Sequence, residues 1–218
     1  MKDIEAIKHY APVEEKINII SHAIGFILSM VALVLLVTYA ILDGDIWHIV
    51  SFSIFGSSLM ILYAASTFYH SVKNPALRNK LNIIDHASIY VLIAGTYTPF
   101  TLVTLKGAIG WVIFGTSWGL ALTGIILKLF FTGKYDLIST IMYVCMGWII
   151  IFAIKPLMNT LPLEGLRWLF AGGISYTIGA ILYSIGSIKF NHAIFHLLVL
   201  TGSFCHFVSV FFYVLPSE

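Results

Sequence analysis

Long apolar segments constrain this chain more than any other feature of its sequence. Seven of them follow one another, separated by short stretches that carry charged residues, glycine or proline. They cover residues 19–42, 46–69, 82–105, 108–131, 137–155, 166–188 and 193–215. A helix needs about 20 apolar residues to cross the hydrocarbon core of a bilayer. The pattern therefore predicts an all-α bundle of seven transmembrane helices, forming a single domain over residues 1–218.

The composition supports a membrane protein. Of the 218 residues, 59% are hydrophobic and only 10% are charged, whereas a soluble domain is about 25% charged. These values exclude a disordered chain, a nucleic-acid-binding protein with a basic face and a disulfide scaffold. A β-barrel would show alternating segments of about ten residues, and none is present. Residues 1–18 lack the features of a secretory signal, and we expect them to form a cytoplasmic segment before the first helix.

The placement of lysine and arginine predicts the orientation of the bundle. Nine of these residues fall on the side of the N-terminus: Lys2, Lys8, Lys16, Lys73, Arg78, Lys80, Lys128, Lys134 and Lys189. Three fall on the opposite side: Lys106, Lys155 and Arg167. Because cytoplasmic loops carry the excess of positive charge, we expect a cytoplasmic N-terminus and an extracellular C-terminus in a multi-pass protein of the cell membrane.

Polar side chains gather at the predicted cytoplasmic ends of several helices. They are Glu15, Asn18, His22, Ser66, His70, Asp85, His86, His192 and His196. Such residues are costly within a membrane and are functional candidates for that reason. His192 and His196 lie four positions apart, so their imidazoles share one helix face. Two histidines of one helix and a third from another are a common zinc-binding set, with an open position for water.

Each of these features has a simpler explanation. A histidine at a helix end often makes only an interfacial hydrogen bond. Asp85 fits a helix N-cap that the helix dipole favours, and Glu15 fits a solvated charge. His206 lies ten residues beyond His196, about 15 Å deeper, so it cannot bind the same ion. We expect it to line a cavity with His86 or with a tyrosine such as Tyr97, or to make an interhelical hydrogen bond.

Small residues at a spacing of four predict close helix packing. Gly115 and Gly119 form one such pair, and Ser175 and Gly179 form another. Packing within one chain is the interpretation that we favour for both pairs, with a dimer face as the alternative. We therefore expect a monomer or a weak homo-oligomer.

The polar residues also carry a resemblance to a known family. Glu15-x-x-Asn18-x-x-Ser21-His22, Ser66-x-x-x-His70, Asp85-His86 and His192-x-x-x-His196 with His206 resemble the haemolysin III-related branch of the progestin and adipoQ receptor family, bacterial type. The stretch from Ala94 to Pro99 resembles the third helix of that family. The resemblance implies seven helices and a zinc ion held by His70, His192 and His196. It also implies that Asp85 holds the water on the zinc and that Ser66 lies beside it.

Three functions remain open at this stage. The leading hypothesis is a zinc-dependent, ceramidase-like hydrolase that acts on an amide or ester bond of a membrane lipid, with Asp85 as the general base. The second is a lipid-sensing regulator of membrane homeostasis in which the zinc is structural. The third is a pore-forming cytolysin, which the seven spans argue against. A transporter is a weaker alternative, because His206 is the one deep ionisable group.

Overall fold

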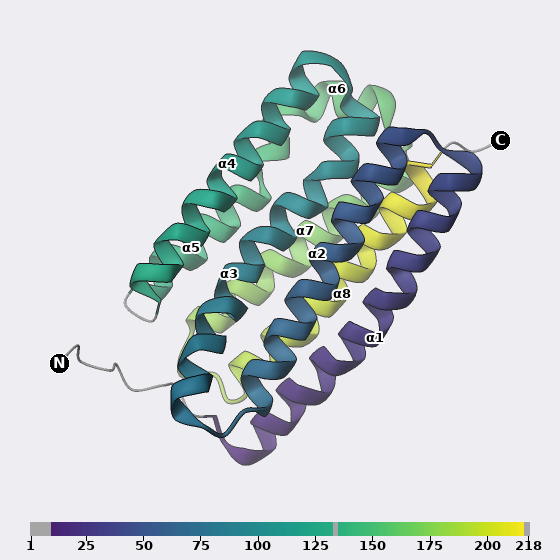
Figure 1. Cartoon of the computed structure of the whole chain (residues 1–218). Helices are drawn as coiled ribbons and strands as arrows, with labels where there is room; N and C mark the ends of the chain where they lie inside the picture. Colours follow the sequence, from purple (N-terminus) through teal and green to yellow (C-terminus); the bar gives the residue numbers. More distant parts are fainter. Residues whose placement is uncertain (1–9, 133–134, 216–218) are drawn as a thin grey trace.

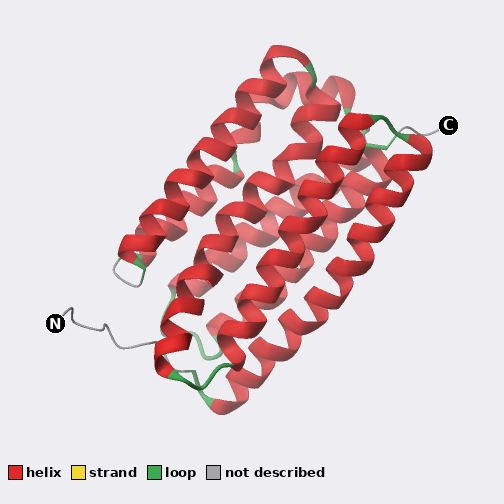
Figure 2. Cartoon of the chain, in the orientation of Figure 1, coloured by secondary structure: helices red, strands yellow, loops and turns green. Residues whose placement is uncertain are grey.

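The chain folds into a helical bundle in the computed structural model, which describes residues 10–132 and 135–215. The described part contains helices and loops but no strand (Figure 2). The helices are α1 (Pro12–Asp43), α2 (Ile46–Ser71), α3 (Pro75–Pro99), η1 (Phe100–Leu105), α4 (Gly107–Phe131), α5 (Asp136–Gly147), η2 (Ile149–Ala153), α6 (Ile154–Thr160), α7 (Leu163–Ser184) and α8 (Asn191–Tyr213). Lys2, Lys8 and Lys134, used above for the orientation, lie outside the described residues.

Six stretches of the described chain are long and apolar enough to cross a membrane. They are Pro12–Asp43, Ile46–Ser71, Pro75–Leu105, Gly107–Phe131, Leu137–Thr160 and Asn191–Tyr213. The remaining long helix, α7, does not meet that criterion, although it packs along α8 within the same bundle (Figure 1). The stretch from Pro75 to Leu105 is the most enclosed of the six. Consecutive long helices run up and down, so the start of α1 and the end of α8 lie at opposite ends (Figure 1).

Two helices begin seven residues earlier than the apolar segments predict. α1 starts at Pro12 and α3 at Pro75, each with proline in the first turn, where its missing N–H costs no hydrogen bond. The Asn74 side chain accepts a hydrogen bond from the backbone N–H of Leu77 at 3.1 Å and caps α3. The early start of α1 places Glu15, Asn18 and the rest of their motif within one helix.

The fifth span differs from the expected segment 137–155. α5 ends at Gly147, a 3-10 turn follows, and α6 continues to Thr160, so the break predicted from Pro156 to Glu164 begins too early. Proline is tolerated there because it falls in the first turn of α6, whose backbone N–H groups have no partner within the helix. The Tyr97 hydroxyl contacts the carbonyl oxygens of Met146 and Gly147 at 2.9 and 2.8 Å. It also accepts a hydrogen bond from the backbone N–H of Ile150 at 3.1 Å. A side chain of α3 thus forms hydrogen bonds with backbone groups at the point where the fifth span is interrupted.

The two pairs of small residues behave differently. The Ser175 hydroxyl donates to the Leu198 carbonyl oxygen at 2.8 Å, and a Cβ on Gly179 would lie 3.2 Å from Leu198, so α7 and α8 approach closely. A Cβ on Gly115 or Gly119 would meet no atom within 4 Å. The expectation that these two glycines pack within the chain is therefore wrong, because their face of α4 is turned outward.

Candidate metal centre

Three histidines from two helices converge at the end of the bundle where α1 begins. His70 lies in the last turn of α2, and His192 and His196 lie in the first two turns of α8. All three are buried. One ring nitrogen of each histidine lies within 4.8 Å of a ring nitrogen of each of the other two. The histidines four positions apart on α8 thus share one face, as the spacing predicts.

The donor set of this cluster fits a zinc ion. Nε2 of His70 and Nε2 of His192 lie 3.1 Å apart. Two nitrogens bound to one tetrahedral zinc at about 2.0–2.1 Å would lie about 3.3 Å apart. Three neutral imidazoles are ligands that suit zinc well. The arrangement can therefore hold a metal ion with little change in the positions of these two rings.

Glu15 fixes the orientation of His70. Nδ1 of His70 donates to Oε2 of Glu15 at 2.9 Å, which leaves the lone pair on Nε2 in the neutral ring. The second carboxylate oxygen of Glu15 accepts a hydrogen bond from Nη2 of Arg78. A carboxylate behind a ligating histidine sets its tautomer and raises its basicity. Glu15 is thus a partner of the cluster, rather than the solvated charge that the simpler explanation allowed.

His196 is held by two residues of α1. Nδ1 of His196 lies 3.4 Å from the backbone oxygen of Asn18. The ring of His22 stacks on the ring of His196 with centroids 3.6 Å apart and an interplanar angle of 9°. Both contacts come from positions one turn apart on α1, since these residues are four apart in the sequence. The structure therefore brings together Glu15, Asn18 and His22, which lie at positions i, i+3 and i+7 of α1.

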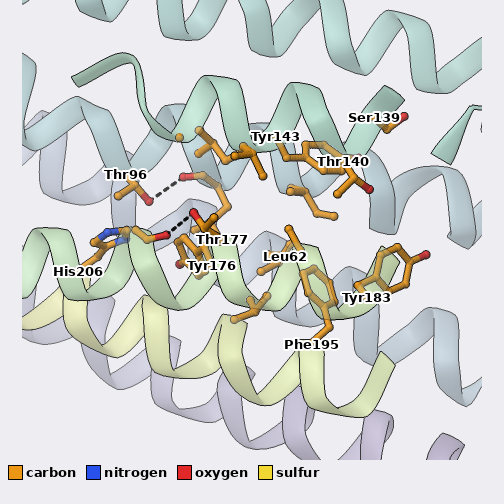
Figure 3. Close-up of a pocket in the computed structure, with 18 of the residues that line it drawn as sticks. Leu62, Thr96, Ser139, Thr140, Tyr143, Tyr176, Thr177, Tyr183, Phe195 and His206 are labelled. Carbon is orange, nitrogen blue, oxygen red and sulfur yellow. Dashed lines mark hydrogen bonds between the residues drawn. The ribbon is translucent and has the colours of Figure 1, made fainter. Parts of the chain in front are cut away.

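A largely apolar cavity of about 140 Å³ adjoins the cluster. His192 and His196 line one part of it, together with Ser66, Asp85 and His86. Its wall includes residues of every long helix, and Figure 3 shows tyrosines, threonines and Phe195 projecting into it. Ser66 and Asp85 are buried, with 1% and 7% exposed. The two side chains expected to act in chemistry thus line the same cavity as two of the three candidate ligands.

His206 lies away from the three histidines, as its sequence position predicts. It lines the same cavity as Tyr97 and His86, and its Nε2 lies 3.2 Å from the Leu169 carbonyl oxygen. Tyr176 packs edge-on against the His206 ring, with centroids 5.2 Å apart (Figure 3). His206 thus lines the cavity and also contacts α7.

Two contributors to the site were missed from the sequence. Arg78 entered the sequence argument only as a loop charge, yet it is buried, and its Nη1 lies 3.3 Å from the Val72 carbonyl oxygen. Tyr10 precedes α1 and stacks on His192. The sequence offers a weak signal for Arg78, because this arginine follows His70, at the polar end of α2, by eight residues. No local signal exists for the second, because its partner lies far along the chain.

The fold and the site define a helical membrane protein with a buried cluster of three histidines beside an apolar cavity. The sequence profile of the family described as "Haemolysin-III related" matches residues 10–207. The chain therefore belongs to the haemolysin-III-related family and is a multi-pass membrane protein.

The curated relatives span most of the chain. Hemolysin-3 of Bacillus cereus is 48% identical over 204 residues, which cover 94% of this chain and 93% of that protein. The Hemolysin-3 homolog of Bacillus subtilis (strain 168) is 49% identical, covering 92% and 94%. The monocyte to macrophage differentiation factor of Homo sapiens is 30% identical, covering 94% and 86%. No solved structure matches the chain. The family resemblance expected from the polar motifs is thus confirmed.

Proposed function

We propose that this protein is a zinc-dependent intramembrane hydrolase that cleaves an amide or ester bond of a membrane lipid. The observation that carries the proposal is the convergence of His70, His192 and His196, whose ring nitrogens lie within 4.8 Å of one another. The apolar cavity beside them has Asp85 and Ser66 in its wall. An open, cavity-facing position is typical of catalytic zinc sites, whereas structural sites are closed.

Each polar residue has a defined task in this proposal. His70, His192 and His196 hold the metal, and a zinc ion supplies the Lewis acidity that activates water and polarises a carbonyl. Asp85 orients the attacking water and accepts its proton. The Ser66 hydroxyl donates a hydrogen bond to the carbonyl oxygen as negative charge develops on it. Glu15, Asn18 and His22 keep the imidazoles in place.

The cavity and the helix ends suggest where the substrate binds. An acyl chain lies in the apolar cavity, and the scissile bond lies at the end of the bundle that carries the histidines. We also propose that all seven long helices, including α7, cross the bilayer of a bacterial plasma membrane. Among the described residues, six of the nine lysines and arginines flank the histidine end: Lys16, Lys73, Arg78, Lys80, Lys128 and Lys189. By the positive-inside rule this end faces the cytoplasm.

The proposal is tested first by metal content. The wild type and a His192→Ala/His196→Ala variant are purified in detergent, supplied with zinc, passed through a desalting column and analysed by mass spectrometry. We expect one zinc per wild-type chain and its loss from the double variant. His48→Ala, which changes a buried histidine at the opposite end of the bundle, is the matched control and keeps its zinc. A well-folded wild type without zinc contradicts the proposal.

Hydrolysis is tested next by release of fatty acid from ceramides and phospholipids in mixed micelles. Release that depends on zinc supports the enzyme. A chain that holds one zinc but releases no fatty acid from any lipid contradicts hydrolysis. It favours the alternative of a lipid-sensing regulator with a structural zinc.

A further inference from the structure

Tyr10 lies flat against one of the candidate metal ligands. Its ring stacks on the His192 imidazole with centroids 4.4 Å apart and an interplanar angle of 19°. The same ring is tilted toward His70, with centroids 5.6 Å apart. Tyr10 precedes the first residue of α1, and α1 begins at the end of the bundle where the histidines lie (Figure 1).

The contact completes a pattern in the N-terminal stretch of the described chain. Residues 10–22 contribute no candidate ligand, yet each of the three histidines is touched by one of them. Glu15 contacts His70 at 2.9 Å, and His22 stacks on His196 at 3.6 Å. Tyr10 makes the corresponding contact with His192, through the stacked rings described above.

We propose that Tyr10 is a positioning residue for the metal centre, which holds the His192 ring in its ligating orientation and shields it from water. This inference rests on the proposed function, since it assumes that the histidines bind a metal. A flat ring at stacking distance opposes rotation of the imidazole about its side-chain bonds, because rotation would break the contact or produce a clash. Hydrogen-bonded outer partners of a ligating histidine account for about 10- to 100-fold in metal affinity, and we expect the stacked ring to contribute at the lower end of that range.

The aromatic ring carries this role, because it is the ring that lies on the His192 imidazole. Phenylalanine preserves the stacked ring, leucine preserves part of the apolar cover without a planar face, and alanine removes both.

The experiment measures how fast zinc leaves the purified, zinc-loaded protein in the presence of a chromogenic chelator. Wild type is compared with Tyr10→Ala, Tyr10→Leu and Tyr10→Phe. Tyr39→Ala is the control, because Tyr39 packs edge-on against Phe211 outside the histidine cluster. We expect release from Tyr10→Ala to be at least about tenfold faster than from wild type, with Tyr10→Leu intermediate. Tyr10→Phe and Tyr39→Ala should stay within about twofold of wild type.

A second readout separates positioning from general stabilisation. With Co²⁺ in place of zinc, the visible absorption bands report the ligand geometry. We expect them to change in Tyr10→Ala and Tyr10→Leu but not in Tyr10→Phe.

Equal zinc release and unchanged cobalt spectra in all variants would overturn the role of Tyr10 while leaving the metal centre intact. Tyr10→Phe that behaves like Tyr10→Ala would overturn the stacking argument. A wild type that binds no metal would overturn the proposed function, and this inference with it. If Tyr10→Ala does not fold, the comparison of Tyr10→Leu with Tyr10→Phe decides.

Discussion

Nδ1 of His70 lies 2.9 Å from the Glu15 carboxylate, although 55 positions separate the two residues. The pair joins the first turn of α1 to the last turn of α2 at the end of the bundle. Because the carboxylate can only accept, it fixes the hydrogen on Nδ1 and leaves Nε2 free for a metal. Arg78 holds the other carboxylate oxygen, so the charge of Glu15 is balanced inside the protein.

Replacing Glu15 by glutamine tests this relationship. Glu15→Gln keeps the size of the side chain but removes the charge that accepts from His70 and Arg78. We expect the affinity for zinc to fall by about 10- to 100-fold, measured by competition with a chelator of known affinity. Glu164→Gln, at an exposed position in the first turn of α7, is the matched control and should bind zinc as wild type does. Unchanged affinity in Glu15→Gln would contradict a role for Glu15 behind His70.

Removing Arg78 should weaken the fold itself. Arg78 is 5% exposed, and its guanidinium bridges the Glu15 carboxylate and the backbone oxygen of Val72. Arg78→Ala leaves a carboxylate in a partly dry site without its cationic partner, which costs about 3–5 kcal/mol for a buried pair. Thermal unfolding in detergent should show a large decrease in Tm, whereas Lys80→Ala, at an exposed position two residues on, should change Tm little. Similar Tm values for the two variants would argue against the buried pair as a structural element.

The Asp85 carboxylate is expected to serve chemistry rather than metal binding. Asp85→Asn keeps the shape of the side chain but cannot accept a proton, so lipid hydrolysis should fall below detection while one zinc per chain remains. Turnover is measured as fatty acid release, and zinc by mass spectrometry of the same preparation. The matched control is Asp43→Asn at the end of α1. Undiminished turnover in Asp85→Asn would remove Asp85 from the mechanism, and loss of zinc would make it a ligand.

Two glycines of α4 should respond in opposite ways to alanine. A Cβ on Gly124 would lie 2.3 Å from the Tyr90 ring, whereas a Cβ on Gly115 would meet nothing within 4 Å. Overpacking costs about 1–3 kcal/mol, and replacing glycine by alanine in an open helix position gains up to about 1 kcal/mol. We expect Gly124→Ala to lower Tm and Gly115→Ala to leave it equal or higher. The reverse order would contradict the helix packing described for α3 and α4.

The cap of α2 predicts a dependence of stability on pH. The Asp45 carboxylate accepts from the backbone N–H groups of Trp47 and His48 at 2.9 and 3.1 Å. The hydrogen bond with the His48 side chain is the largest cause that lowers the pKa of Asp45 below its ordinary value. Desolvation opposes it, and the backbone contacts with His48 and Trp47 add to the lowering. A carboxyl group whose pKa is lowered by folding stabilises the protein above its unfolded pKa, and loses that effect as the pH falls through its folded pKa.

Asp45→Ala is the variant that tests the cap. The difference in Tm between wild type and Asp45→Ala should be largest above about pH 4 and should shrink as the pH is lowered further. Scans in detergent across this range measure it, with Asp43→Ala as the control. A difference that is constant with pH would show that the ionised carboxylate does not stabilise the cap.

Much of the fold could be predicted from the sequence, because segment length and hydropathy alone decide whether a helix can span a bilayer. The apolar segment 108–131 lies within one residue of α4. The apolar segments misplace the starts of α1 and α3 and the end of the fifth span, and one reason accounts for all three. Apolarity marks the part of a helix that faces lipid, whereas the ends of a helix are set by capping and by backbone hydrogen bonds. Pro156 illustrates this difference, since it breaks a helix interior but is tolerated in a first turn.

The sequence by itself determined which residue types can bind a metal and the faces on which neighbours of one helix project. The i, i+4 spacing of His192 and His196 is a property of any helix, and so is the stripe of Glu15, Asn18 and His22. Only the tertiary structure decided that α1 braces the histidines of α2 and α8, that Arg78 is buried beside Glu15, and that Tyr10 lies on His192. These relationships join residues up to 182 positions apart. Helix packing, rather than any local preference of the chain, sets the distances between them.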